Sequence, residues 1–209
     1  PELGCYGDPF VKTPVLDKLA SAGARFPNAY VPQAGCSQSR ASFLTGLYPH
    51  QNGQIGLATH KYSMHRSWPS IPSLLKEQGY RTGIIGKLHV NPENQFQFDM
   101  RQGDGFGSRQ VKKQLQYARD YVSQSNDRPW FLMFNVFDPH VAGKRAKNQP
   151  AFPDVVEGIP ATPIGPEDVD AWPWQGVDTT AMRKRIAGSY NCVQRVDAAV
   201  GMLMRSLER

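Results

Sequence analysis

The sequence predicts an α/β fold in which a mostly parallel central sheet carries helices on both faces. Helix-forming segments alternate with apolar extended segments three times, which is the pattern of parallel strands joined by helices. The segment PWFLMFNVF at 129–137 is predominantly apolar, as expected for a central parallel strand buried on both faces. A long amphipathic segment follows near the C-terminus. Since no repeat or second-domain boundary is visible, we expect one α/β unit.

The first helix–strand pair occupies the N-terminal part. Thr13 suits a helix N-cap, Pro14 suits the first helical position, and Gly23 marks the end of the helix. The residues ARFPNAYV at 24–31 then predict an extended strand. This strand would lead directly into the polar stretch that contains Cys36.

The second helix is predicted to begin one or two residues after Cys36 and to stop at Gly46. Residues 47–66 are rich in His, Gln, Asn and Gly, which predicts a loop. The third helix, at 70–79, again ends in a glycine, and YRTGIIG at 80–86 predicts a buried strand. The second and third helices thus precede the second strand of the sheet.

Two further amphipathic helices are predicted in the C-terminal half. Residues 108–126 place apolar side chains on one face, and the strand at 129–137 follows. A Pro-rich stretch at 149–174 has no periodicity, which predicts irregular structure. In the last helix, apolar residues recur at steps of three and four: Met182, Ile186, Tyr190, Val193, Val196, Val200, Leu203 and Leu207.

Composition excludes several classes of protein. Hydrophobic residues make up 40% of the chain and charged residues 20%, which is typical of a globular protein. No stretch approaches the ~20 apolar residues of a membrane helix. The net charge of +6 is dispersed, so nucleic acid is not an expected partner. The three cysteines form no Cys-x-x-Cys pair, which argues against a zinc knuckle or a thioredoxin-type site.

Three polar clusters follow the predicted strands. They are Cys36-Ser37-Gln38-Ser39-Arg40, Gly86-Lys87-Leu88-His89 and Asp138-Pro139-His140. Ligands of open α/β sheets bind beyond the carboxyl ends of the strands, so the clusters are expected to meet. If the chain stays extended there, Lys87 and His89 point to the same side. Each residue alone has an ordinary explanation as a buried thiol, a surface cation or a loop histidine. Their shared position favours a common site.

The residue types suit an anion such as sulfate or phosphate. Cys36 stands near a helix N-terminus, where free N–H groups and the helix dipole attract anions. Arg40 lies one turn later on the same face, and Lys87 adds a second positive charge. His89 and His140 can donate hydrogen bonds or protonate a leaving group. These five residues form the predicted catalytic set.

The sequence resembles the sulfatase family. The family signature Cys-x-Pro-Ser-Arg with a following Thr-Gly is matched by residues 36–40 and by Thr45-Gly46. The Gly-Lys-x-His and Asp-Pro-His motifs occur in the order and separation seen in the family. The stretches HQNGQIGL, RTGIIGKLHVNPE and DRPWFLMFNVFDPH are similar to the heparan N-sulfatase (sulfamidase) branch.

The resemblance implies an alkaline-phosphatase/sulfatase-like fold and hydrolysis of sulfate esters or sulfamates of sugars, with N-sulfoglucosamine as the favoured substrate. It implies that a maturation enzyme oxidises Cys36 to formylglycine, whose aldehyde hydrate is the nucleophile. Arg40 would steady the hydrate and His89 would tune it, while Lys87 and His140 would bind sulfate oxygens. A divalent cation, usually Ca²⁺, would bind the formylglycine at position 36.

Two features depart from the family pattern. Gln38 stands where the signature has proline, and the Asp-Asp and Asp-Asn pairs that bind the family's metal are not found. Residues 1–209 therefore resemble an internal part of the N-terminal catalytic domain, with the first strand, the C-terminal portion and the other metal ligands outside the chain. The isolated chain is expected to be inactive. The remaining aspartates are interpreted as surface or capping residues: Asp8, Asp17, Asp99 and Asp104.

Two alternatives stay open. A phosphoester or phosphonate hydrolase of the same fold would use the same formylglycine, and a non-catalytic sulfatase-like protein would bind sulfated glycans with Cys36 unmodified. The expected partners are a sulfated sugar or glycosaminoglycan fragment and the maturation enzyme, and a homodimer is allowed. No Asn-x-Ser/Thr sequon occurs, which favours a periplasmic or extracellular protein over a lysosomal one.

Overall fold

The computed structural model describes residues 2–103, 109–124, 127–141 and 151–208. The chain divides into two compact units. Unit 1 comprises residues 1–27, 109–115 and 137–209, and unit 2 comprises residues 28–108 and 116–136. Both units are discontinuous in sequence, so no single linker marks the division. The expectation that the chain is part of one catalytic domain stays a prediction.

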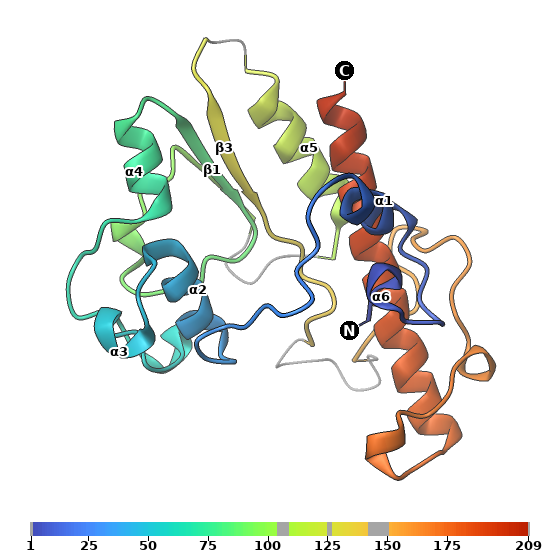
Figure 1. Ribbon diagram of the computed structural model, residues 1–209. Coiled ribbons are helices and arrows are strands. Elements are labelled where there is room, and N and C mark those ends of the chain that lie inside the picture. The colour runs from blue at the N-terminus through green and yellow to red at the C-terminus, as the bar shows by residue number, and fades with distance from the viewer. Residues whose placement is uncertain (1, 104–108, 125–126, 142–150, 209) are drawn as a thin grey trace. The chain divides into compact units, whose positions relative to one another are not determined.

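The sheet lies in unit 2 and has three parallel strands in the order β2-β1-β3 (Figure 1). The central strand β1 (Arg81–Ile85) is buried along its whole length and pairs with β3 (Trp130–Phe134). The strands predicted at 80–86 and 129–137 are thus confirmed, as is the parallel α/β architecture. Strand β2 (Met100–Gln102) was not predicted, because three residues of mixed polarity carry no periodic signal.

Two expectations about strands are wrong. Among the described residues β3 has one partner strand and is mostly half-buried, so it is an edge strand rather than the central one. Residues 24–31 form no strand, and the side chains of Phe26 and Tyr30 are 67% and 89% exposed. Hydrophobic residues predicted an extended strand there, but the segment has no neighbouring strand with which to form a ladder.

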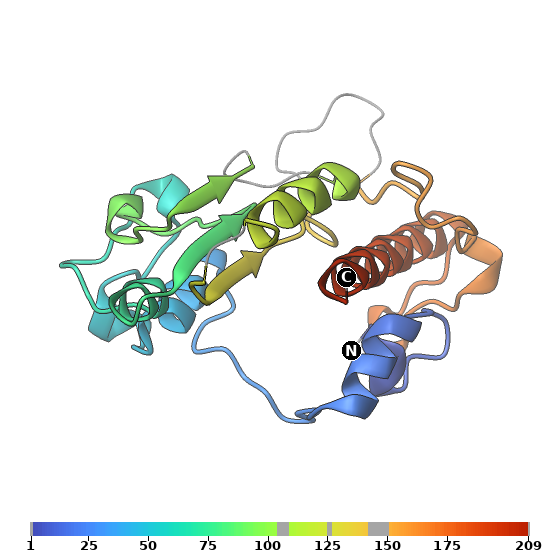
Figure 2. The same ribbon diagram turned by 90° about the horizontal axis from the view of Figure 1, so that it is seen from above.

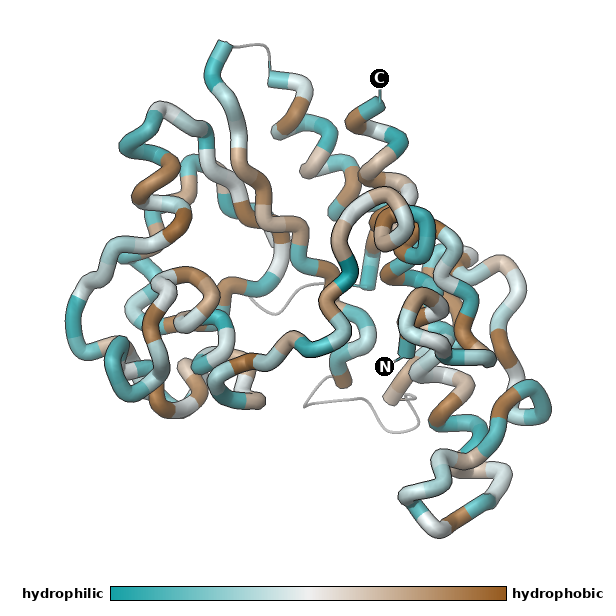
Figure 3. The backbone as a smooth tube through the Cα atoms, in the orientation of Figure 1, coloured by the Kyte–Doolittle hydropathy of each residue, from teal (hydrophilic) through white to brown (hydrophobic). Residues whose placement is uncertain are grey.

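Helices α2 (Cys36–Thr45), α3 (Pro49–Asn52) and α4 (Ile71–Glu77) also belong to unit 2. The loop expected at 47–66 therefore contains a helical turn, which Pro49 begins and which the Gln51 side chain closes by accepting the N–H of Tyr48. Helix α4 contacts β1, and Figure 3 shows hydrophobic residues along part of the strands. The core of unit 2 consists of Ala41, Leu44, Met64, Ile84, Leu88, Val90 and Phe96.

Unit 1 is built around the long helix α6 (Thr180–Leu207), against which α1 (Pro14–Ala22) packs (Figures 1 and 2). The predicted apolar stripe is confirmed in the first half of α6, where it forms the core with residues from the preceding segments. Further along, Arg195 and Asp197 are buried instead of the neighbouring Val196. The core of unit 1 consists of Val11, Val169, Ile186, Ala187, Tyr190 and Val193.

The start of α1 is capped from a distant part of the chain. Thr13 stands at the N-cap position, as predicted, but its side chain does not cap the helix. Instead it accepts a hydrogen bond from the N–H of Gly4. The N–H of Leu16 donates to the carboxylate of buried Asp197 at 2.8 Å. A side chain of α6 thus supplies the cap that local sequence predicted for Thr13.

The remaining predictions concern α5 and the Pro-rich stretch. Helix α5 (Val111–Val122) is shorter than the predicted 108–126, of which residues 108, 125 and 126 lie outside the described part. The described part of 149–174 is irregular apart from short turns, as predicted, and residues 149 and 150 are not described. No helix within the described ranges is long and apolar enough to cross a membrane.

Candidate functional site

Cys36 is the first residue of α2, slightly before the predicted start, and is half-buried. The extended Gly35 precedes it with φ −120° and ψ 139°. The next two residues fix the first turn: the Ser37 hydroxyl accepts the N–H of Ala58 at 2.9 Å, and the Gln38 amide donates to the carbonyl of Ile55 at 3.2 Å. The helix therefore presents residue 36 from a firmly held end.

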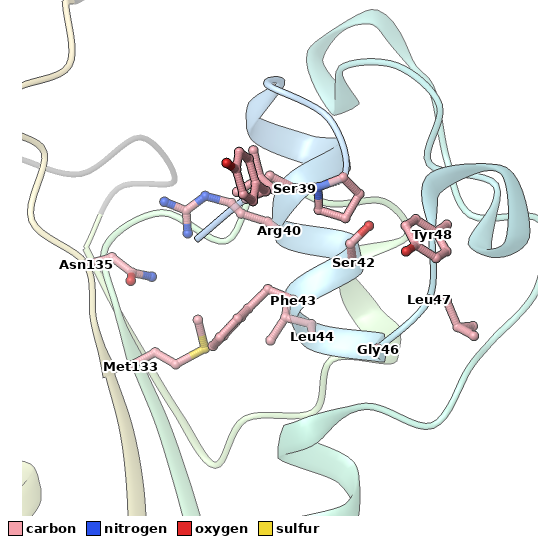
Figure 4. Close-up of a pocket in the computed structure, with 13 residues that line it drawn as sticks. Ser39, Arg40, Ser42, Phe43, Leu44, Gly46, Leu47, Tyr48, Met133 and Asn135 are labelled. Atoms are coloured by element: carbon pink, nitrogen blue, oxygen red, sulfur yellow. The ribbon is translucent and has the colours of Figure 1, made fainter. Parts of the chain in front are cut away.

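Three elements of unit 2 meet at one carbonyl oxygen. Arg40 of α2 donates through Nη1 to the carbonyl of Lys87 at 2.8 Å. Asn135, just after β3, donates through Nδ2 to the same oxygen at 2.9 Å. Figure 4 shows the Arg40 guanidinium directed toward Asn135. Sequence reasoning missed Asn135, whose only signal was a polar residue inside the apolar run FNVF.

The chain turns sharply after β1, which positions Lys87 and His89. Gly86 has φ +85°, and a Cβ there would collide with the carbonyl oxygen of Asn135. His89 also adopts a left-handed φ of +56°, which is uncommon for a residue other than glycine. The segment is therefore not extended, so the simple alternation expected of Lys87 and His89 is wrong. Both residues are buried, at 9% and 8% exposure, and are not solvated loop residues.

Arg40 keeps its positive charge in this environment. Burial lowers the pKa of its guanidinium, and the neighbouring Cys36 partly opposes that shift. Arginine nonetheless stays protonated, since its ordinary pKa is above ~12. Within the described part of unit 2, the ion pairs join Lys76 to Asp99 and Arg101 to Glu93, and none involves Arg40. The charge beside residue 36 is thus balanced by a backbone dipole rather than by a carboxylate.

A pocket of ≈ 580 Å³ opens beside α2 and the end of β3 (Figure 4). Arg40 and Asn135 line it together with Ser39, and apolar side chains such as Phe43 and Met133 line the rest. The pocket is large enough for a sugar-sized molecule. It shows that one side of the cation of Arg40 faces open space.

The third predicted cluster belongs to unit 1. Asp138 is buried, and each of its carboxylate oxygens accepts a guanidinium N–H at 2.7 Å, one from Arg109 and one from Arg195. His140, two residues later, is exposed. Unit 2 therefore brings Arg40 close to Cys36 and to the backbone of Lys87, whereas a site shared with the side chains of Lys87, His89 and His140 stays a prediction.

The carboxylates of the chain do not form a metal site in the described ranges. No group of three or more His, Cys, Asp or Glu side chains converges there. Asp8 and Asp17 accept backbone N–H groups, and Asp99 accepts the N–H of Thr82, as expected of capping residues. Asp104 lies outside the described residues. A divalent cation needs several converging oxygen ligands, so the donors that the structure describes do not by themselves fit one.

Comparisons with known proteins agree with the geometry. The family model described as Sulfatase matches residues 1–209. Human N-sulphoglucosamine sulphohydrolase is 35% identical, over 99% of this chain and 44% of that protein. The chain therefore spans less than half the length of this relative.

Solved structures show the same fold. An enzyme in complex with its substrate D-glucosamine-2-N,6-O-disulfate has a TM-score of 0.72 at 18% identity, over 99% of this chain and 59% of that one. The phosphonate monoester hydrolase of Agrobacterium radiobacter has a TM-score of 0.71 at 16% identity, over 99% and 56%. The alkaline-phosphatase/sulfatase-like fold is thus confirmed. Together with the match over its whole length, this shows that the chain belongs to the sulfatase family.

Proposed function

We propose that the natural protein containing this chain hydrolyses sulfate esters or sulfamates of sugars, with N-sulfoglucosamine-type substrates favoured. The observation that carries the proposal is the arrangement of Cys36 and Arg40. Residue 36 begins a helix, and one turn later a cation that no described carboxylate neutralises lies at a pocket. An anionic group would meet the helix dipole and this cation together. The name of the human relative, N-sulphoglucosamine sulphohydrolase, supports the choice of sugar.

In the proposed reaction, Cys36 acts as a precursor that a separate maturation enzyme oxidises to formylglycine. The hydrated aldehyde has two hydroxyl groups on one carbon. One attacks the sulfur, and the bond from sulfur to the sugar nitrogen or oxygen breaks as that atom takes a proton. The second hydroxyl then loses its proton, the carbon–oxygen bond to sulfate breaks, and the aldehyde re-forms. A serine or thiol would lack the second hydroxyl and would stall as a sulfated enzyme.

The other residues of the predicted set have separate roles in this proposal. Arg40 steadies the hydrate and the charge on the sulfo group, and Lys87 binds a sulfate oxygen. His140 binds another sulfate oxygen, and His89 sets the protonation of the hydrate. The family's divalent cation, usually Ca²⁺, enters no step here, because the donors among the described residues do not fit it. We therefore expect the isolated 209-residue chain to turn over no aryl sulfate when calcium or magnesium is added.

Two other functions fit parts of the structure. A phosphonate or phosphoester hydrolase would use the same helix terminus and cation, and the fold shared with the Agrobacterium radiobacter enzyme is compatible with it. A non-catalytic glycan-binding protein would retain a free thiol at Cys36. Comparing turnover of an aryl sulfate and an aryl phosphate by the natural protein separates the first alternative from sulfate hydrolysis.

Direct inspection of residue 36 tests the formylglycine step. A peptide spanning position 36 from active natural protein should react with a hydrazide probe, and Cys36→Ala should abolish turnover. Cys5→Ala is the matched control, since Cys5 is also a half-buried free cysteine but lies in unit 1. A free thiol at position 36 in fully active protein would contradict the mechanism. A free thiol in protein that binds sulfated glycans without turnover would favour the binding alternative.

A further inference from the structure

The turn that carries His140 is contacted at several points by the side chain of Arg109. Its Nε donates to Oδ1 of Asp138 at 2.7 Å, and its Nη2 donates to the carbonyl oxygen of His140 at 2.7 Å. The same guanidinium lies 4.6 Å from the centroid of the Phe137 ring. Arg109 thus contacts the start, the acidic residue and the end of the turn at residues 137–140.

The imidazole of His140 depends on the same turn. The N–H of His140 donates to the carbonyl of Phe137 at 2.9 Å, which closes the turn. The two rings meet edge to face, with centroids 5.2 Å apart and an interplanar angle of 76°. Arg109 packs against the Phe137 ring and binds the His140 backbone. It therefore constrains both the ring that the imidazole contacts and the backbone that carries it.

Asp138 connects this turn to helix α6. Its second oxygen, Oδ2, accepts Nε of Arg195 at 2.7 Å, and the Arg195 side chain is fully buried. Arg195 also donates through Nη1 to the carbonyl of Asp154 at 3.0 Å. With each oxygen already bound to a guanidinium, Asp138 is not placed to act as a proton acceptor. It links Arg109 to a fixed anchor.

We propose that Arg109 is a positioning residue for His140, and that Arg195 holds Asp138 in place for it. This inference rests on the proposed function, in which His140 binds a sulfate oxygen. Arg109 binds a carboxylate and a carbonyl at once, which takes two N–H groups that point in different directions from one rigid, planar guanidinium. A lysine ammonium keeps the positive charge but lacks this planar pair of donors, so it cannot make both hydrogen bonds in the same geometry. A small displacement of a reacting group lowers turnover by up to ~10²-fold.

The test uses Arg109→Lys in the natural protein, alone and combined with His140→Ala. We expect Arg109→Lys to lower kcat for an aryl sulfate by about 10- to 100-fold and to change KM little. In the His140→Ala background the same substitution should cost less than about twofold, because the residue through which it acts is gone. Arg183→Lys is the matched control: Arg183 is half-buried and binds both oxygens of Asp178 at 2.7 Å, but it has no contact with the turn at residues 137–140 in the described structure.

Two outcomes would overturn the proposal. Equal losses of kcat in both backgrounds would mean that Arg109 acts on the general structure rather than through His140. An NMR spectrum of the imidazole gives a reading that needs no turnover: the His140 ring signals should move in Arg109→Lys and stay in place in Arg183→Lys. If the natural protein hydrolyses no sulfate, the proposed function fails, whereas unchanged His140 signals in Arg109→Lys would refute the positioning role itself.

Discussion

The two compact units differ in what binds their partly or fully buried arginines. In unit 1, Asp138 lies between Arg109 and Arg195, so a carboxylate partly offsets two positive charges. In unit 2, Arg40 donates to the backbone carbonyl of Lys87 and has no ion pair with a described carboxylate. A cation bound to a carboxylate stabilises the fold, whereas one bound only to a dipole can still attract a ligand. The contrast teaches that the exposure of an arginine side chain does not by itself show whether it binds a ligand or stabilises the fold.

The largest expected effect comes from removing the shared carboxylate. Asp138→Asn should lower the free energy of unfolding by about 3–5 kcal/mol, because the buried guanidinium of Arg195 and the half-buried one of Arg109 lose their counter-ion. Arg40→Gln should cost about 1 kcal/mol or less, since Asn135 still donates to the Lys87 carbonyl. Urea unfolding followed by tryptophan fluorescence measures both. Similar losses for the two variants would break the comparison between the units.

The second expected effect is on turnover. Arg40→Ala and Lys87→Ala should each lower kcat/KM of the natural protein about 100-fold or more, as for loss of a preorganised charge. Lys184→Ala, which removes an exposed cation of α6, should change it little. Near-normal activity in Lys87→Ala would show that the strand-end residues of unit 2 do not share a site.

The third expected effect concerns backbone geometry in unit 2. Gly86 and Gly79 have nearly the same φ, +85° and +84°, but only at Gly86 would a Cβ collide with a neighbour, the carbonyl of Asn135. Each Gly→Ala change should lower the free energy of unfolding by about 1–2 kcal/mol, because alanine disfavours the left-handed conformation. Gly86→Ala should cost about 1–3 kcal/mol more, because the clash must be relieved. Thermal unfolding of the two variants checks this, and equal stabilities would disprove a crowded turn after β1.

The smallest expected effect is a dependence of stability on pH in unit 1. Burial, and next the charge of Asp138, raise the pKa of the Cys192 thiol to about 12. In the unfolded chain this group ionises near its ordinary pKa of 9.0. The unfolded state therefore loses its proton first, so stability is fully present below pH ~9 and falls as pH rises toward 12. Between pH 8 and 10 the wild type should lose up to about 1 kcal/mol more than Cys192→Ala.

The elements set by local sequence were predictable. Helices α1 and α4 are followed by glycines, α6 carries its own apolar periodicity, and β3 is a continuous apolar run. The candidate site residues of unit 2 could be proposed from the sequence because they follow a helix start and a strand end. The segment at 24–31 was misread, because hydrophobic residues specify a strand only where a neighbouring strand can pair with them.

The contacts between distant residues were not predictable. Arg109 and Arg195 lie 29 and 57 residues from Asp138 in the sequence, and nothing near either arginine indicates the pairing. Asn135 was hidden in an apolar run for the same reason. The apolar stripe of α6 failed where buried Arg195 and Asp197 replaced hydrophobic residues. Their burial depends on partners that only the folded chain brings together.

The capping of α1 by Asp197 has a consequence for the order of assembly during synthesis. The N–H of Leu16 and its carboxylate acceptor are separated by 181 residues. At ~5–20 residues per second, the ribosome delivers that acceptor roughly 9 to 36 seconds after the helix it caps. Until then, residues 1–27 lack the helix against which they pack. Unit 1 therefore closes only after α6 has been synthesised, whereas the residues of unit 2 all precede α6 in the sequence and can fold earlier.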